Sequence, residues 1–181
     1  MDRILFVSAS AKNGSCKALL EELQTKFWLQ HSTEVVHIRD YPAEPCCGCE
    51  ACFATDGECV KQDKIHILME KILDAKIVVF ATPNYFYNMS GLAKTFVDRT
   101  YRYYTNKALH GKKFIYLYTG EDTPDNIKKY LDNAMYGFNV CHNINVLGSF
   151  AVSTEDDGVY KSPADKEQVI SKITKLITEN L

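Results

Sequence analysis

Apolar residues along the chain alternate between short continuous runs, typical of buried strands, and repeats spaced three and four residues apart, typical of helices. The run Arg3–Ser8 predicts a first strand. From Gly14 the spacing changes, and apolar residues recur on one helical face as far as Phe27. Four further runs, rich in β-branched or aromatic residues, predict the remaining strands: Glu34–Arg39, Lys76–Ala81, Phe114–Tyr118 and Asn143–Val152.

Capping residues mark where the other helices are expected to begin. Asp63 precedes one apolar helical face, and Ser90 precedes a helix that we expect to reach about Tyr104. The last two helices each begin with a capping residue followed by a proline, which suits a first helical turn: Thr123-Pro124 and Ser162-Pro163.

Strands and helices therefore alternate, which predicts a parallel sheet with helices on both faces. Five strands favour the doubly wound, flavodoxin-like α/β fold with strand order 2-1-3-4-5. A chain of 181 residues suits a single domain over residues 1–181. In such folds, ligands bind at the carboxyl ends of the strands. Three loops qualify: Ser8–Cys16, Thr82–Met89 and Thr119–Asp122.

Composition narrows the class of protein. Hydrophobic residues make up 46% and charged residues 24%, and the formal net charge is −2. We therefore expect neither a nucleic acid nor an anionic membrane as partner, since no strong basic field exists to hold one. The aliphatic run Ile4–Val7 is too short for a signal peptide or a membrane span, so we expect a cytoplasmic protein.

The first loop, Ser8–Cys16, is rich in small and hydroxyl residues and leads into a helix. Free N–H groups at a helix N-terminus suit an anion, and the loop matches neither dinucleotide-binding nor Walker patterns, so a monophosphate is the natural ligand. An ordinary polar loop is the alternative. In the second loop, Tyr85, Phe86 and Tyr87 suit a planar heterocycle, although such rings also pack on a sheet edge or on another subunit.

Five of the seven cysteines lie in a cysteine-rich loop at residues 45–60. Four of them have the spacing C-x2-C-x2-C-x6-C: Cys46, Cys49, Cys52 and Cys59. Because the expected compartment is reducing, this cluster indicates a metal or redox role rather than disulfides. A cubane iron–sulfur cluster, a zinc ion and free thiols all remain open, and Cys47 could replace Cys46.

Three stretches together resemble the NADPH-dependent FMN reductase family and, within it, the iron–sulfur flavoproteins. They are Lys12-Asn13-Gly14 before the first helix, the cysteine-rich loop with Gly57–Asp63, and Ala81–Phe86 continuing to Lys94 and Asp98-Arg99. The likeness covers about Ile4 to Phe150. Ala11 stands where the family has an arginine, so one charged partner of the phosphate is missing, and Lys12 is the expected substitute.

The resemblance implies roles for particular residues. Those that would hold the FMN phosphate are Ser8, Ser10, Lys12, Asn13, Gly14, Ser15 and Cys16. Those that would border the isoalloxazine ring are Pro83, Asn84, Tyr85, Phe86 and Tyr87, with Thr119 and Gly120 beneath the third loop. The expected ligands of a [4Fe-4S] cluster are Cys46, Cys49, Cys52 and Cys59.

The resemblance further implies an FMN-dependent oxidoreductase that takes hydride from NAD(P)H and passes electrons to a small molecule or a redox protein. Because the flavin carries the redox chemistry, we assign no catalytic side chain. An iron–sulfur flavoprotein electron carrier without NAD(P)H activity is the alternative, and a zinc-stabilised interaction module without flavin is a third. A homodimer or homotetramer is expected.

Overall fold

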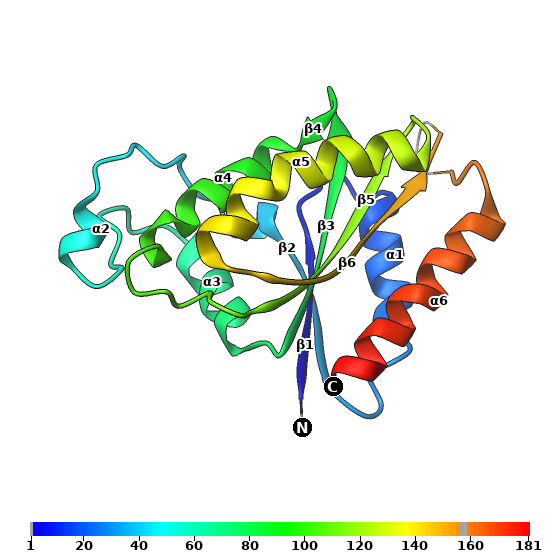
Figure 1. The fold of residues 1–181 in the computed structure, drawn as a ribbon, viewed down its shortest axis with the longest axis horizontal. Coiled ribbons are helices and arrows are strands. Elements are labelled where there is room, and N and C mark those ends of the chain that lie inside the picture. The colour runs from blue at the N-terminus through cyan, green and yellow to red at the C-terminus, as the bar shows by residue number, and fades with distance from the viewer. Residues whose placement is uncertain (1, 156–158) are drawn as a thin grey trace.

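The core of the protein is a parallel sheet in the order β2-β1-β3-β5-β6, seen in the computed structural model, which describes residues 2–155 and 159–181 (Figure 1). Its strands are β1 (Arg3–Ser8), β2 (Ser32–His37), β3 (Ile77–Tyr85), β5 (Lys113–Gly120) and β6 (Asn145–Ser153). The two-residue strand β4 (Asn88–Met89) pairs antiparallel with β3, outside this path. The predicted doubly wound order of five parallel strands is confirmed.

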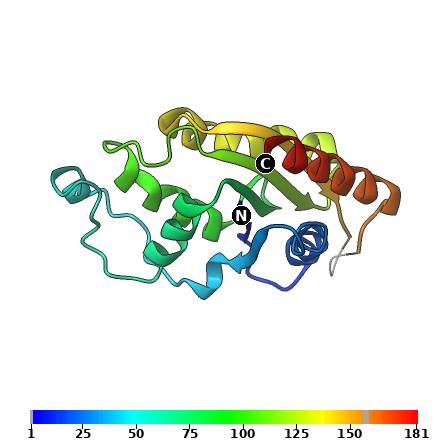
Figure 2. The ribbon, with the colours of Figure 1, turned by 90° about the horizontal axis from the view of Figure 1, so that it is seen from below.

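Helices cover both faces of the sheet (Figure 2). One face carries α1 (Ser15–Gln24) and α6 (Pro163–Asn180), and the other carries α3 (Ile65–Asp74), α4 (Gly91–Arg99) and α5 (Pro124–His142). Side chains of β1 alternate between the two cores, since Leu5 and Val7 belong to one and Ile4 and Phe6 to the other. Burial on both faces explains why the central strands are apolar along most of their length.

Three of the four predicted helix caps are confirmed. The hydroxyl groups of Ser90, Thr123 and Ser162 each accept a hydrogen bond from the backbone N–H three residues later. The prediction that Asp63 caps α3 is wrong, because Lys64 occupies the cap position and makes no side-chain cap bond. The carboxylate of Asp63 instead accepts hydrogen bonds from Arg99, on another helix.

Element boundaries differ from the predicted ones where tertiary contacts intervene. Strand β3 runs on to Tyr85, because its end pairs with β5 and with β4. Strand β2 ends at His37, and the next three residues form the 3₁₀ helix η1 (Ile38–Asp40). Helix α4 ends at Arg99 and continues as the 3₁₀ helix η2 (Thr100–Tyr103).

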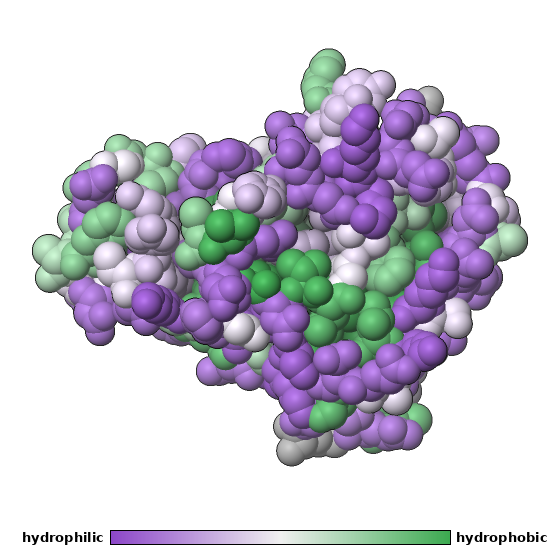
Figure 3. All heavy atoms as spheres, viewed as in Figure 1, coloured by the Kyte–Doolittle hydropathy of each residue, from purple (hydrophilic) through white to green (hydrophobic). Residues whose placement is uncertain are grey.

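The cysteine-rich loop projects from the body of the molecule beside the end of α4 (Figure 1). It includes one short helix, α2 (Ala51–Ala54). Figure 3 shows apolar surface in the middle of one face, where the edge strand β6 runs between α5 and α6. Among the described residues, no helix is long and apolar enough to cross a membrane.

Candidate functional site

The three predicted loops meet at the carboxyl edge of the sheet and enclose an open cleft of about 860 Å³. All the predicted cofactor-binding residues line it except Ser8. They are Ser10, Lys12, Asn13, Gly14, Ser15, Cys16, Pro83, Asn84, Tyr85, Phe86, Tyr87, Thr119 and Gly120. Ser8 is buried beneath the first loop, where its hydroxyl oxygen lies 3.4 Å from the backbone N–H of Ser10 and accepts from it.

The N-terminus of α1 offers the cleft a set of free hydrogen-bond donors. Its cap residue is Gly14, which has no side chain to bond these groups, and the first turn carries no acidic residue. No described residue accepts from the backbone N–H groups of Ser15 and Cys16. Unbonded N–H groups and the helix dipole together favour an anion at this point. This end of the cleft therefore fits a phosphate group.

Arg39 reaches the first loop from the end of β2, a contact that the sequence pattern did not predict. Its Nη1 donates to the carbonyl oxygen of Ala11 at 3.0 Å, and its Nη2 donates to Oδ1 of Asn13. The contact could have been predicted from the strand order, which places the end of the second strand beside the first loop. Lys12 also lines the cleft, as the sequence suggested.

Asn84 presents an unpartnered acceptor in the second loop. Its Oδ1 is buried, finds no hydrogen-bond partner among the described residues, and belongs to a residue that lines the cleft. A buried carbonyl oxygen without a donor is costly, so a ligand N–H or O–H group would stabilise it. Gly120 lies against this residue, since an added Cβ would come within 3.0 Å of Asn84 Cβ. Any larger residue at position 120 would therefore require Asn84 to shift by a few tenths of an ångström.

The aromatic residues of the second loop form a tight turn between β3 and β4. Phe86 and Tyr87 both adopt positive φ angles, of 50° and 59°, which non-glycine residues rarely do. The ring of Tyr87 packs 4.8 Å from that of Tyr130 on α5, while Phe86 is fully exposed to solvent. The turn therefore holds an unpacked aromatic ring at the rim of the cleft.

The third loop joins the cleft through Cys16, whose Sγ lies 3.2 Å from Oγ1 of Thr119. Burial raises the pKa of the Cys16 thiol to about 11, so it is a neutral structural contact. Asp122 also lines the cleft, but its Oδ1 accepts from the Thr123 N–H at 2.6 Å, at the start of α5. This bond holds that carboxylate against the positive end of a helix.

Glu121 and two residues that the sequence analysis missed, Thr154 and Glu155, complete the lining of the cleft. The two missed residues follow β6. They could have been predicted, because all parallel strands of one sheet end at the same edge.

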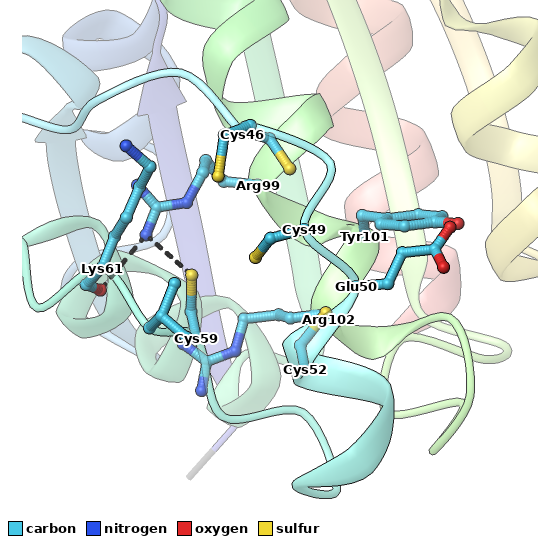
Figure 4. A pocket seen from close by; sticks show the side chains of 11 residues that line it. Cys46, Cys49, Glu50, Cys52, Cys59, Lys61, Arg99, Tyr101 and Arg102 are labelled. Carbon is cyan, nitrogen blue, oxygen red and sulfur yellow. Dashed lines mark hydrogen bonds between the residues drawn. The ribbon is translucent and has the colours of Figure 1, made fainter.

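The five cysteines of the projecting loop line one small cavity (Figure 4). Cys46, Cys49, Cys52 and Cys59 stand around a common space, with Arg99 and Arg102 at its border. Burial raises the pKa of the Cys52 thiol, and the charges of the other three add to this effect. Within residues 2–155 and 159–181, no three cysteine, histidine or acidic side chains are arranged closely enough to hold a metal ion.

The chemistry of this cavity nevertheless suits an anionic metal–thiolate centre. Thiolates select zinc and iron–sulfur clusters among biological metal centres. Nη2 of Arg99 lies 3.5 Å from Sγ of Cys59, and Lys61 also lines the cavity. These cations complement the negative charge that four thiolates would carry. Cys47 differs from the other four, since a hydrogen bond from Cys49 lowers the pKa of its thiol.

Arg99 also ties together the two ends of the cysteine-rich loop. Its guanidinium is almost fully buried and bonds the carbonyl oxygen of Glu44 at 2.9 Å and Oδ1 of Asp63 at 3.1 Å. Asp63 in turn accepts from the backbone N–H of Glu44 at 3.1 Å. Partial burial acts to raise the pKa of Asp63, but the bond and charge of Arg99 hold that pKa below its ordinary value. The ion pair of Arg99 and Asp63 thus joins the residues that flank the cysteine-rich loop.

The fold and the cleft define a doubly wound α/β protein with an uncapped helix N-terminus in a cleft at the carboxyl edge of its sheet. The chain matches the model of the NADPH-dependent FMN reductase family over residues 3–156. It therefore belongs to this family.

Known relatives agree with this assignment. Two iron–sulfur flavoproteins of Archaeoglobus fulgidus are 33% and 30% identical to the chain over 99 and 125 residues. These matches cover 54% and 68% of this chain, but only 48% and 55% of those proteins, so the chain spans about half of their length. The crystal structure of a WrbA-like flavodoxin from Agrobacterium tumefaciens superimposes with a TM-score of 0.65 at 13% identity. That match covers 99% of this chain and 98% of the other, and the fold is flavodoxin-like.

Proposed function

We propose that the protein is an FMN-dependent oxidoreductase that accepts hydride from NAD(P)H and delivers electrons to a small-molecule or redox-protein acceptor. One observation carries the proposal. In a member of the FMN reductase family, the cleft combines an uncapped helix N-terminus with the unpartnered, buried Oδ1 of Asn84. A phosphate at one end and a hydrogen-bond donor at the other are what FMN offers to these two features.

The residues of the cleft would bind and orient FMN and would not themselves react. The N–H groups at the start of α1 and the hydroxyl groups of Ser10 and Ser15 would hold the phosphate, and Asn84 would accept from the flavin. When bound, FMN supplies the electron transfer itself. The cleft is open to solvent beside Tyr85 and Phe86, which leaves room for a second planar molecule. No side-chain acid or base is required.

A second candidate function is that of an iron–sulfur flavoprotein that carries electrons. The cavity lined by Cys46, Cys49, Cys52 and Cys59, with cations at its border, favours it. The relatives from Archaeoglobus fulgidus are named iron–sulfur flavoproteins. In this form the four thiolates would ligate a [4Fe-4S] cluster, and Arg99 and Lys61 would offset its negative charge.

The test is an ultraviolet–visible spectrum of protein purified without air, before and after addition of NADPH or NADH. Two flavin bands that NAD(P)H bleaches support the reductase. Flavin bands on a broad absorption that only dithionite bleaches support the electron carrier. If no flavin bands appear even after FMN is added, the proposed function is wrong.

Iron, zinc and acid-labile sulfide are measured on the same samples. Iron with sulfide, lost in Cys52→Ser and retained in Cys141→Ser, supports the cluster. Cys141 is the matched control, because it is an exposed cysteine outside the cysteine-rich loop. Zinc without sulfide identifies a structural metal site instead.

We further propose that the protein acts as a homodimer or homotetramer. The fully exposed ring of Phe86, held on a turn of positive φ angles, supports this proposal, because such a ring gains most when another surface covers it. Sedimentation equilibrium of the wild type and of Phe86→Ser tests it. The variant should dissociate at higher concentration than the wild type if the ring lies in the interface.

A further inference from the structure

The tip of the first loop depends on one side chain from another element. Residues Ala11 to Asn13 belong to no helix or strand. Ser8 and Ser10 accept from N–H groups of the loop, but neither bonds the carbonyl groups of the tip. Among the described residues, only Arg39 donates to the tip, through the Ala11 carbonyl oxygen and Oδ1 of Asn13.

The second of these bonds sets the direction in which Asn13 faces. A neutral amide has one acceptor oxygen and one NH₂ donor group. Because Arg39 occupies the oxygen of Asn13, the NH₂ group is left free, and Asn13 lines the cleft beside the N-terminus of α1. The contact therefore leaves the NH₂ group of Asn13 to face the cleft as a hydrogen-bond donor, and a phosphate requires donors.

Arg39 also brings a permanent positive charge to the loop tip, where it contacts Asn13, a residue that lines the cleft. Its side chain is 28% exposed, and the nearest carboxylate, that of Asp40, lies 3.8 Å from Nε. Both Nη groups face the loop rather than Asp40. Ala11, to whose carbonyl group Arg39 donates, has no charge of its own. Arg39, in η1, thus adds a second cation to that of Lys12 at the first loop.

We propose that Arg39 is the positioning residue that makes the cleft select a phosphorylated flavin over an unphosphorylated one. It fixes the loop tip, orients Asn13 as a donor and supplies positive potential at the phosphate. The inference rests on the proposed FMN function and deepens it, since it names the residue that distinguishes FMN from riboflavin.

The experiment compares the affinities of FMN and riboflavin for flavin-free protein by quenching of flavin fluorescence. Arg39→Met should weaken FMN binding about 10- to 100-fold, the range for lost hydrogen bonds that involve a charged group. Riboflavin affinity should change less than about threefold, within the range of a surface substitution. Arg39→Lys should lie between, because lysine keeps the charge but not the fork of two donors.

Arg3→Met is the matched control. Arg3 is 29% exposed and pairs with Glu34 and Asp74, and it lies at the start of β1, at the opposite end of the strand from the first loop. It should change neither affinity. The salt dependence of FMN binding should also weaken in Arg39→Met and persist in Arg3→Met, which a merely structural role would not cause.

Three results would overturn the inference. If Arg39→Met binds FMN as the wild type does, the arginine is not needed. If FMN and riboflavin lose affinity equally while circular dichroism shows a folded protein, Arg39 supports the loop without selecting phosphate. If the wild type binds neither flavin, the proposed function itself fails, which distinguishes that failure from the other two.

Discussion

Replacing Asp63 with asparagine should destabilise the protein strongly, because Arg99 would stay buried without a counter-charge. Arg99 is 3% exposed, and both of its Nη groups donate to Asp63. Removing one partner of a buried ion pair typically costs about 3–5 kcal/mol. We expect a loss near the lower end, about 3 kcal/mol, since asparagine still offers one acceptor oxygen. Urea unfolding followed by circular dichroism at pH 7 measures the change.

The effect should also depend on pH in a defined direction. The pKa of Asp63 is lowered in the folded state, so its stabilisation is present above the ordinary aspartate pKa. It is lost as the pH falls through the lower, folded-state value. The difference in unfolding free energy between wild type and Asp63→Asn should therefore shrink when the measurement moves from pH 7 to about pH 3.5.

Lys94→Met is the control, because Lys94 forms an exposed ion pair on α4, the helix that carries Arg99. Lys94 pairs with Asp98 at 2.5 Å, but the two side chains are 59% and 42% exposed. An exposed pair of this spacing contributes about 0.3–0.5 kcal/mol. If Asp63→Asn costs no more than Lys94→Met, or if the cost does not change with pH, the reasoning about the buried pair is refuted.

Three further predictions concern the cleft and the core. Ser90→Ala should lower the unfolding free energy by about 1–3 kcal/mol, because it removes a helix cap and the bond to the Ala9 carbonyl oxygen at 2.6 Å. A loss below about 0.5 kcal/mol in a urea titration would contradict this. Gly120→Ala should weaken FMN binding more than it lowers stability, since its Cβ would meet Asn84 at 3.0 Å; equal FMN affinity by fluorescence titration would show that the loops can separate. Burial lowers the pKa of His142, so the stability of the folded protein should fall as the pH drops below about 6.5. Thermal unfolding of His142→Gln should show a smaller fall. If the variant's stability falls with pH as steeply as the wild type's, His142 is not the source.

The role of Arg99 shows where reasoning from local patterns stops. The sequence placed Arg99 in a helix correctly, and Asp63 just before another helix. Asp63 has the side chain of a helix cap, so local propensity favoured that role. In the structure, both Nη groups of Arg99 donate to this carboxylate. An unpaired buried charge costs more free energy than a helix N-terminus without a side-chain cap, so the ion pair forms.

The sequence by itself determined the strands, the order of the sheet and the three loops at its carboxyl edge. These follow from hydrophobic periodicity and from the rules of parallel connection, which depend on neighbouring residues and on chain direction. The tertiary structure alone decided that Arg39 braces the first loop, that Arg99 closes the cysteine-rich loop and that Asn84 is left without a donor. Such contacts join residues 28 to 55 positions apart, and their partners depend on how side chains pack in three dimensions rather than on any local pattern.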